Sequence, residues 1–273
     1  MTENTSSETR ENRYQRLAAW VFLKHYRPGD THIEWTRDEL RQGAVALGIE
    51  LPKNLGDVVY AIRYRIDFPS SMLDVAPAGL EWIIRSVGRS RYAFDLIPAQ
   101  VRIRPNLALE VTKIPDATPE IVAASALGDE QALLALVRYN RLIDIFLGVA
   151  SFSLQNHLRT SVKGVGQVEV DEVYVAVDRY GRHFILPVQA KGGSDEIGIT
   201  QTEQDIAVCA EKWPEKICRP ISAQFGEDGR IALFELSLQN DQVKVRRESH
   251  YQLVPAKDIT SVDLQNYDLA AGS

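Results

Sequence analysis

The sequence predicts an α/β protein in which a mixed β-sheet flanked by helices follows a mainly α-helical N-terminal region. Three observations favour this class. Apolar residues recur at helical spacing over residues 14–66, prolines interrupt regular structure over 97–120, and short segments with alternating apolar residues follow residue 167. Helix, strands, helix and further strands in that order are typical of α/β architecture.

Composition sets limits on the function. The chain has 273 residues with 45% hydrophobic and 25% charged residues, the mix of a soluble globular protein of one or two domains. A net charge of -6 argues against holding nucleic acid by bulk charge alone, but it allows a local basic surface. We expect residues 1–12 to be a disordered lead-in, because they are polar and lack the pattern of a signal peptide.

The two cysteines, Cys209 and Cys218, have no CxxC or Cys/His cluster around them, so no zinc site is expected. Reduced thiols and the lack of an apolar run of about 18 residues predict a cytoplasmic protein without a membrane helix.

The N-terminal region predicts three helices and a hairpin, over residues 14–26, 36–49, 55–66 and 80–97. Thr36 and Glu39 have capping-box spacing at the start of the second helix, and Gly48 suits its end. Two helices joined by a tight turn and followed by a hairpin are the layout of a winged helix-turn-helix. Such a domain would bind duplex DNA.

The DNA-binding candidates lie at the second helix of that pair and at the hairpin tip. A helix start offers free amides to phosphates, and arginine and tyrosine side chains bind phosphates and base edges. The helix candidates are Lys53, Asn54, Tyr60, Arg63, Tyr64 and Arg65, and the tip candidates are Arg89 and Arg91. A merely solvated helix face, or a surface for protein contacts, remains an open alternative.

We place the boundary between two domains at about residue 110, which gives a winged-helix domain over 13–110 and a second domain over 111–273. The second domain predicts a long helix over 129–148, with residues 151–160 continuing the helical layer. Strands over 167–178 and 182–191 then join through a turn at Tyr180 and Gly181. A helix over 195–213 follows, with a buried stripe of Ile199, Ile206, Cys209, Ala210 and Trp213, and strands over 216–225, 230–238 and 242–254 close the chain.

The two strands of this hairpin carry the candidate catalytic residues. Alternation along a strand puts Glu169 and Asp171 on one face, and Gln189 and Lys191 on one face of the neighbouring strand. Carboxylate oxygens bind Mg²⁺, and a metal-bound water becomes more acidic. Gln189 would add an oxygen to the metal shell, and Lys191 would orient the water and balance negative charge. These parts suit phosphodiester hydrolysis.

Asp171, Gln189 and Lys191 resemble the motif of the PD-(D/E)xK nucleases, in the Q-x-K form of the Mrr-like restriction endonucleases. The resemblance covers roughly residues 130–225. It implies a restriction-endonuclease-like fold and Mg²⁺-dependent cleavage of DNA. The chain departs from the motif because no proline precedes Asp171 and the segment before it, "SLQNHLRT", offers no acid. Asp171 is the first choice as metal ligand and Glu169 the second, while Glu172 should point to the opposite face.

The sequence therefore predicts a Mg²⁺-dependent endonuclease of the restriction or defence type. We expect it to act on duplex DNA as a homodimer, because two strands need two cuts and twofold symmetry matches the duplex. A non-enzymatic DNA-binding regulator with a sensor or dimerisation domain is the alternative, and action on RNA or branched DNA stays open. Gln201, Gln204 and Asp205 could face the site or only the solvent, and His157 and His183 are expected to be structural or solvated.

Overall fold

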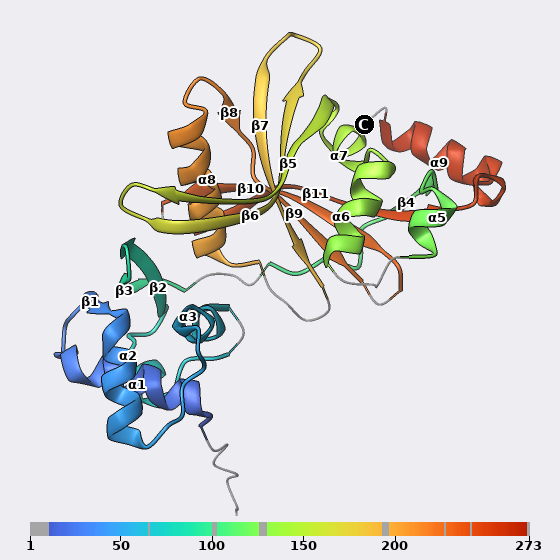
Figure 1. The fold of residues 1–273 in the computed structure, drawn as a ribbon. Helices are drawn as coiled ribbons and strands as arrows, with labels where there is room; N and C mark the ends of the chain where they lie inside the picture. Colours follow the sequence, from blue (N-terminus) through green and yellow to red (C-terminus); the bar gives the residue numbers. More distant parts are fainter. Residues whose placement is uncertain are drawn as a thin grey trace, which may run out of the picture. The chain divides into compact units, whose positions relative to one another are not determined.

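The structure is a computed structural model that describes residues 11–64, 66–99, 103–125, 130–192, 197–226, 228–240 and 242–271. The chain divides into two compact units, one of residues up to 99 with 163–166 and one of the remaining residues. The protein is of the mixed α/β class, with helices and a mixed eight-stranded sheet (Figure 1). In the described part of the chain, no helix is long and apolar enough to cross a membrane.

The first unit contains helices and a three-stranded sheet. Its elements are α1 (Arg13–His25), β1 (His32–Thr36), α2 (Arg37–Leu47), α3 (Leu55–Tyr64), α4 (Ser70–Leu73), β2 (Leu80–Gly88) and β3 (Arg91–Pro98). The three helices and the hairpin lie where the sequence predicts them. The sequence did not predict β1, which pairs with β3 and gives the strand order β1-β3-β2.

Aromatic side chains form much of the core of this unit. The ring of Phe22 on α1 contacts Trp82 and Phe94 edge-on, and Trp35 on β1 stacks on Phe94. These four side chains are at most 3% exposed. Because β1 supplies Trp35 to this cluster, the short strand helps to close the core over the helices.

Glu39 stabilises the start of α2 through the predicted capping box, in which its carboxylate accepts from the backbone amide of Thr36 at 2.8 Å. The same carboxylate binds Lys24 at 2.8 Å and His25 at 2.6 Å. Burial alone would raise the pKa of Glu39, but the bonds from Lys24, Thr36 and His25 outweigh it and lower the pKa to about 2. Gly48 ends the helix with a φ of 63°, which glycine adopts without strain.

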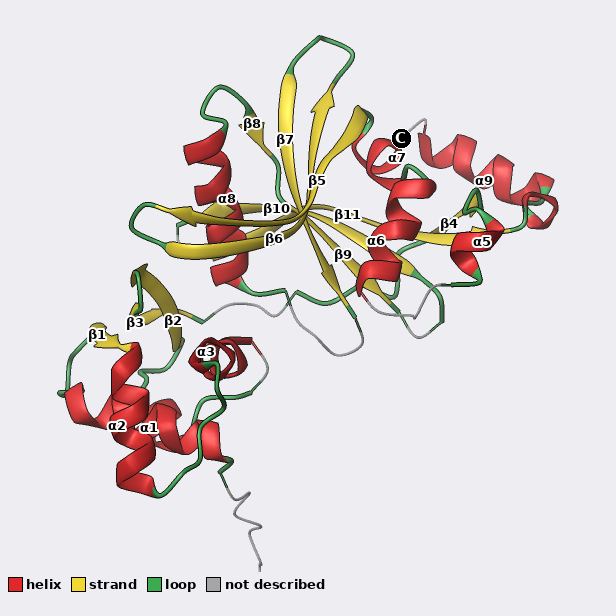
Figure 2. Ribbon diagram, in the orientation of Figure 1, coloured by secondary structure: helices red, strands yellow, loops and turns green. Residues whose placement is uncertain are grey.

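The second unit is built on the large sheet (Figure 2). Its elements are β4 (Val111–Pro115), α5 (Glu120–Ala123), α6 (Glu130–Tyr139), α7 (Leu142–Leu147), β5 (Ala150–Val162), β6 (Gly166–Val177), β7 (His183–Lys191), α8 (Ile199–Lys212), β8 (Ile217–Cys218), β9 (Ile221–Phe225), β10 (Ile231–Gln239), β11 (Gln242–Val254), a 3₁₀ turn (Ala256–Asp258) and α9 (Ser261–Ala271). The strand order is β4-β11-β10-β9-β7-β6-β5, and β8 also pairs with β7.

Two predictions for this unit are wrong. Residues 151–160 form part of strand β5 and not a helix, because the segment pairs with β6 at the edge of the large sheet. The single helix predicted over 129–148 is two helices, α6 and α7, separated where Arg141 adopts a left-handed φ of 51°. Strand β4 and helix α9 were not predicted.

Different helices cover the two faces of the central strand β7. It pairs antiparallel with β6 and parallel with β9, and helix α8 makes the crossover between β7 and β9. On one face Leu186, Val188 and Ala190 pack into a core with α6 and α7. Residues of the opposite parity, Gln189 and Lys191, therefore lie on the face that α8 covers.

Candidate active site

Asp171 and Gln189 lie beside each other on strands β6 and β7. The paired residues of these strands end at Glu172 and Val188, so Asp171 and Gln189 occupy the next position on each strand. The backbone amide of Ala190 donates to Asp171 Oδ2 at 2.9 Å, which fixes the carboxylate against β7. The structure thus brings together the acid and the Q-x-K segment that the sequence singles out.

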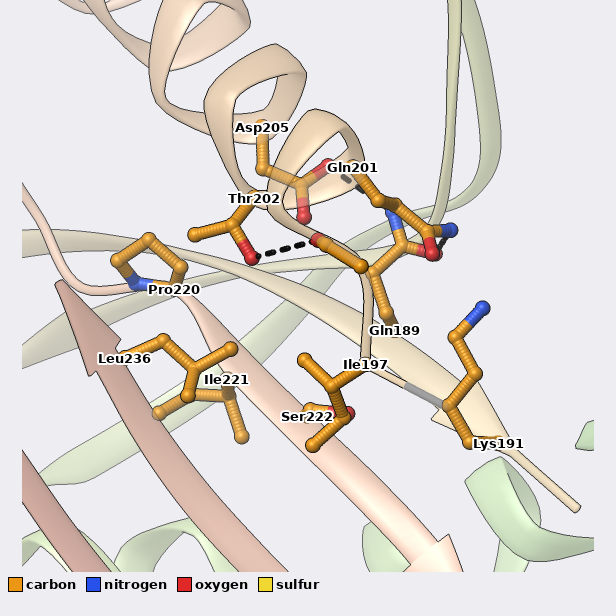
Figure 3. A pocket seen from close by; sticks show the side chains of 11 residues that line it. Gln189, Lys191, Ile197, Gln201, Thr202, Asp205, Pro220, Ile221, Ser222 and Leu236 are labelled. Carbon is orange, nitrogen blue, oxygen red and sulfur yellow. Dashed lines mark hydrogen bonds between the residues drawn. The ribbon is translucent and has the colours of Figure 1, made fainter. Parts of the chain in front are cut away.

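Gln189 is held by two side chains from helix α8. Its side-chain amide donates from Nε2 to Asp205 Oδ1 at 2.9 Å, and its Oε1 accepts from Gln201 Nε2 at 2.7 Å (Figure 3). Gln189 is 4% exposed and Asp205 is 2% exposed. Two of the three polar residues proposed for this helix, Gln201 and Asp205, therefore face the site and not only the solvent.

The prediction of which α8 residues are buried is partly wrong, because Asp205 faces Gln189 and is buried. Ala210 is exposed, whereas Thr202 and Asp205 are buried with Cys209. Asp205 faces the sheet, where it accepts from Gln189, whereas the hydroxyl of Thr202 donates to the Gly198 carbonyl at the start of the helix. A spacing of four residues between Gln201 and Asp205 was the sequence signal that the two share a helix face.

Lys191 completes the cluster from the end of β7. Its side chain is partly buried, and its amine lies on the side of Gln189 and Gln201 in Figure 3. Among the residues that the structure describes, which exclude 193–196, no hydrogen bond or ion pair of Lys191 is found. Its positive charge lowers the pKa of Asp171 and of Asp205.

The site contains more buried acid than its single lysine balances. Burial raises the pKa of Asp171, against the opposing effects of the Ala190 amide and Lys191. Burial also raises the pKa of Asp205 to about 8; the Gln189 amide lowers it, and the charge of Asp171 raises it further. A divalent cation beside these carboxyl groups would favour their ionised forms, because opposite charge stabilises a carboxylate.

The oxygen atoms of Asp171 and Gln189 suit a hard cation. Asp171 offers a carboxylate and Gln189 a carbonyl oxygen with a second lone pair, the ligand types that Mg²⁺ prefers. Among the described residues, no group of three or more His, Cys, Asp or Glu side chains could hold a metal, so protein carboxylates alone do not form a complete metal site. Mg²⁺ commonly binds through one or two carboxylates and water, so a small protein donor set is enough.

The other two acids of β6 differ in their surroundings. The carboxylate of Glu169 is 44% exposed, and it binds Arg159 at 3.1 Å. Glu172 points to the opposite face as predicted: it is fully buried and binds Arg138 at 2.8 Å and the Ser153 hydroxyl at 2.6 Å. Glu169 lies on the same face of β6 as Asp171, whereas Arg138 and Ser153 hold Glu172 on the opposite face.

A small hollow adjoins the cluster between α8 and strands β7, β9 and β10. Its lining includes Gln189, Lys191, Gln201, Asp205 and Ser222 (Figure 3). The volume of this hollow is about 10 Å³, room for about one water molecule and far below the roughly 300–1,000 Å³ of ordinary small-molecule pockets. The hollow is therefore too small for an organic ligand.

The helix candidates for DNA binding differ in their exposure and in the contacts that the structure shows for them. Lys53 and Tyr60 are exposed. Asn54 acts as the cap of α3, since its Oδ1 accepts from the Gly56 amide at 3.0 Å. Arg63 is partly buried and donates to the Ser86 hydroxyl at 3.2 Å. Asn54 and Arg63 therefore have structural contacts that the sequence did not indicate.

The tip candidates and the remaining helix candidates complete this comparison. Arg89 is exposed at the turn between β2 and β3, and Arg91 forms an ion pair with Glu34 on β1. Arg65 and the side chain of Tyr64 lie outside the described residues. Lys53, Tyr60 and Arg89 are the candidates whose exposure best suits contact with DNA.

Comparison with known proteins adds no assignment: no protein-family model, no curated protein and no solved structure matches the chain.

Proposed function

We propose that the protein is a Mg²⁺-dependent endonuclease that hydrolyses phosphodiester bonds in duplex DNA, of the restriction or defence type. The observation that carries this proposal is the meeting of Asp171, Gln189 and Lys191 on one face of two adjacent strands. An acid, an amide oxygen and a lysine amine beside a small hollow are the parts that such hydrolysis needs.

The order of elements supports the proposal. Helices α6 and α7, the strands β5, β6 and β7, helix α8 and then β9 parallel to β7 follow the helix, strand-hairpin, helix, strand order of the PD-(D/E)xK core. Glutamine at position 189 is the Q-x-K variant of that motif. The first unit supports a winged helix by its own order, in which a hairpin follows three helices and pairs with β1.

The proposed roles follow from the contacts. Asp171, held by the Ala190 amide, and Gln189, held by Asp205 and Gln201, present oxygens that would bind the cation, with Glu169 able to join them. When bound, Mg²⁺ makes a coordinated water more acidic and offsets negative charge on the phosphate. The positively charged amine of Lys191 would orient that water, favour the loss of its proton to solvent by stabilising the hydroxide, and balance charge as the phosphate is attacked.

Binding of DNA is assigned to the first unit, through Lys53 and Tyr60 at α3 and Arg89 at the hairpin tip. Helix α3 would enter the major groove, and the tip would contact the backbone or minor groove. A homodimer would supply two active sites related by twofold symmetry, one for each strand of the duplex.

The test is incubation of the full-length protein with unmodified and methylated duplex DNA, with Mg²⁺ or with EDTA, followed by mapping of the ends. Cleavage that needs Mg²⁺ and is lost in Asp171→Ala and Lys191→Ala is expected. The matched controls, Glu110→Ala and Lys257→Ala, remove an exposed acid and an exposed lysine of the same unit and should cleave normally. Cleavage that survives in both Asp171→Ala and Lys191→Ala would refute the proposal.

One observation favours the alternative, a non-enzymatic DNA-binding regulator. Both polar ends of the Gln189 amide already have partners within the protein, as expected of a purely structural residue. The regulator would bind DNA without cutting it under any metal condition, and Gln189→Ala would then change stability but not DNA chemistry. The same cleavage experiment separates the two functions.

A further inference from the structure

Asp205 is the most deeply buried acid on the α8 side of the large sheet, and the motif residues do not include it. Its side chain lies on α8, one turn after Gln201, and it binds Gln189 Nε2 at 2.9 Å. Among the described residues, its hydrogen bonds involve only Gln189. Burying a carboxyl group costs free energy unless the group is hydrogen-bonded or paired with an opposite charge.

The contact fixes the orientation of the Gln189 amide. In its ionised form, which a neighbouring divalent cation would favour, the Asp205 carboxylate only accepts hydrogen bonds, so it selects the NH₂ end of the glutamine. The carbonyl oxygen must then point the other way, where Gln201 donates to it at 2.7 Å. Without Asp205, the orientation of the glutamine would rest on Gln201 and on the long contact from Gln189 Nε2 to the Glu169 carbonyl oxygen, at 3.5 Å.

The contact also places the Asp205 carboxyl group against the NH₂ end of the Gln189 amide. Glutamine carries no charge, whereas a hard cation is bound most strongly by ionised oxygens. Asp205 and Gln189 together provide one acid and one amide. A pair with the acid at position 189 and the amide at position 205 would contain the same two groups.

We propose that Asp205 is a positioning residue for the cation: it orients the carbonyl oxygen of Gln189 toward the bound ion and provides, through Gln189, the negative charge that this amide lacks. The inference rests on the proposed metal-dependent function. Residues that hold a metal ligand from behind typically change metal affinity by about 10- to 100-fold when they are replaced.

The test measures binding of Mn²⁺ to the full-length protein by electron paramagnetic resonance, without DNA and therefore without turnover. Asp205→Asn is expected to weaken Mn²⁺ binding by about 10- to 100-fold. The double variant Gln189→Glu/Asp205→Asn exchanges acid and amide and should recover binding to within about threefold of the unchanged protein.

Each outcome decides a separate point. If Asp171→Asn abolishes binding but Asp205→Asn leaves it unchanged, the inference fails and the proposed function stands. A double variant no better than Asp205→Asn also overturns the inference, since a purely structural role predicts no rescue by exchange. If the unchanged protein binds no Mn²⁺, both the inference and the proposed function fail. Thermal unfolding of each variant identifies losses caused by misfolding, and the double variant then decides.

Discussion

Replacement of Arg138 by leucine should destabilise the second unit strongly. The carboxylate of Glu172 is 0% exposed, and Arg138 binds it at 2.8 Å. Removing one partner of a buried ion pair costs about 3–5 kcal/mol, because the remaining charge stays in a medium that does not solvate it. The Ser153 hydroxyl still donates to Glu172, and the Arg138 side chain is 34% exposed, so the lower end of that range applies.

A cost of about 3 kcal/mol lowers the melting temperature by roughly 6–12 °C for a unit of this size. Urea unfolding and thermal unfolding, followed by circular dichroism, measure both quantities. The matched control is Arg159→Leu, which removes an arginine of the same unit whose ion pair with Glu169 is exposed, and it should cost less than about 1 kcal/mol.

Rescue tests whether the buried charge is the cause. Adding Glu172→Gln to Arg138→Leu removes that charge and should recover a substantial part of the lost stability. The reasoning is refuted if Arg138→Leu costs no more than Arg159→Leu, or if the added Glu172→Gln makes the protein still less stable.

Three further outcomes are expected. Lys53→Ala and Arg89→Ala should each weaken DNA binding across sequences and reduce the slope of log affinity against log salt by about 1, measured by fluorescence anisotropy; unchanged slopes would exclude phosphate contacts. Glu39 has a folded pKa of about 2, below its ordinary value, so it stabilises the first unit above pH about 4.5 and this contribution disappears as pH falls toward 2. Urea unfolding between pH 6 and 3 should therefore show a weaker loss in Glu39→Gln than in the unchanged protein, and equal losses would contradict this account. Leu186→Ala leaves a cavity at a position that is 0% exposed and should cost about 2–5 kcal/mol in urea unfolding, and a cost below 1 kcal/mol would contradict the packing described for β7.

The strands that carry the site were predictable because their residue pattern is regular. Residues 167–178 alternate, the run before Gln189 is apolar, and a tyrosine–glycine turn joins the two segments. The register that puts Asp171 against β7 follows from that hairpin, so the meeting of Asp171 with Gln189 was predictable as well.

Other features depend on contacts that are distant in the sequence. Strand β5 was taken for a helix because a short segment with few apolar residues fits either period, and pairing with β6 decides its conformation. Asp205 could not be assigned from its helix, since only β7 determines that this polar face is buried. The sequence does not distinguish the capping role of Asn54 from a DNA contact, because the same residue type serves both a helix start and a DNA contact.

The most direct measurement of the central claim compares the unchanged protein with Asp171→Asn on one labelled duplex, recording cleavage with Mg²⁺ and anisotropy-detected binding in the same samples. Loss of metal binding removes several kcal/mol of transition-state stabilisation, so cleavage should fall by about 100-fold or more. Binding of DNA should change little, because the candidate contacts lie in the first unit. An Asp171→Asn protein that cleaves at the normal rate, or an unchanged protein that binds DNA but leaves it intact with Mg²⁺, would contradict the assignment of a metal-dependent nuclease.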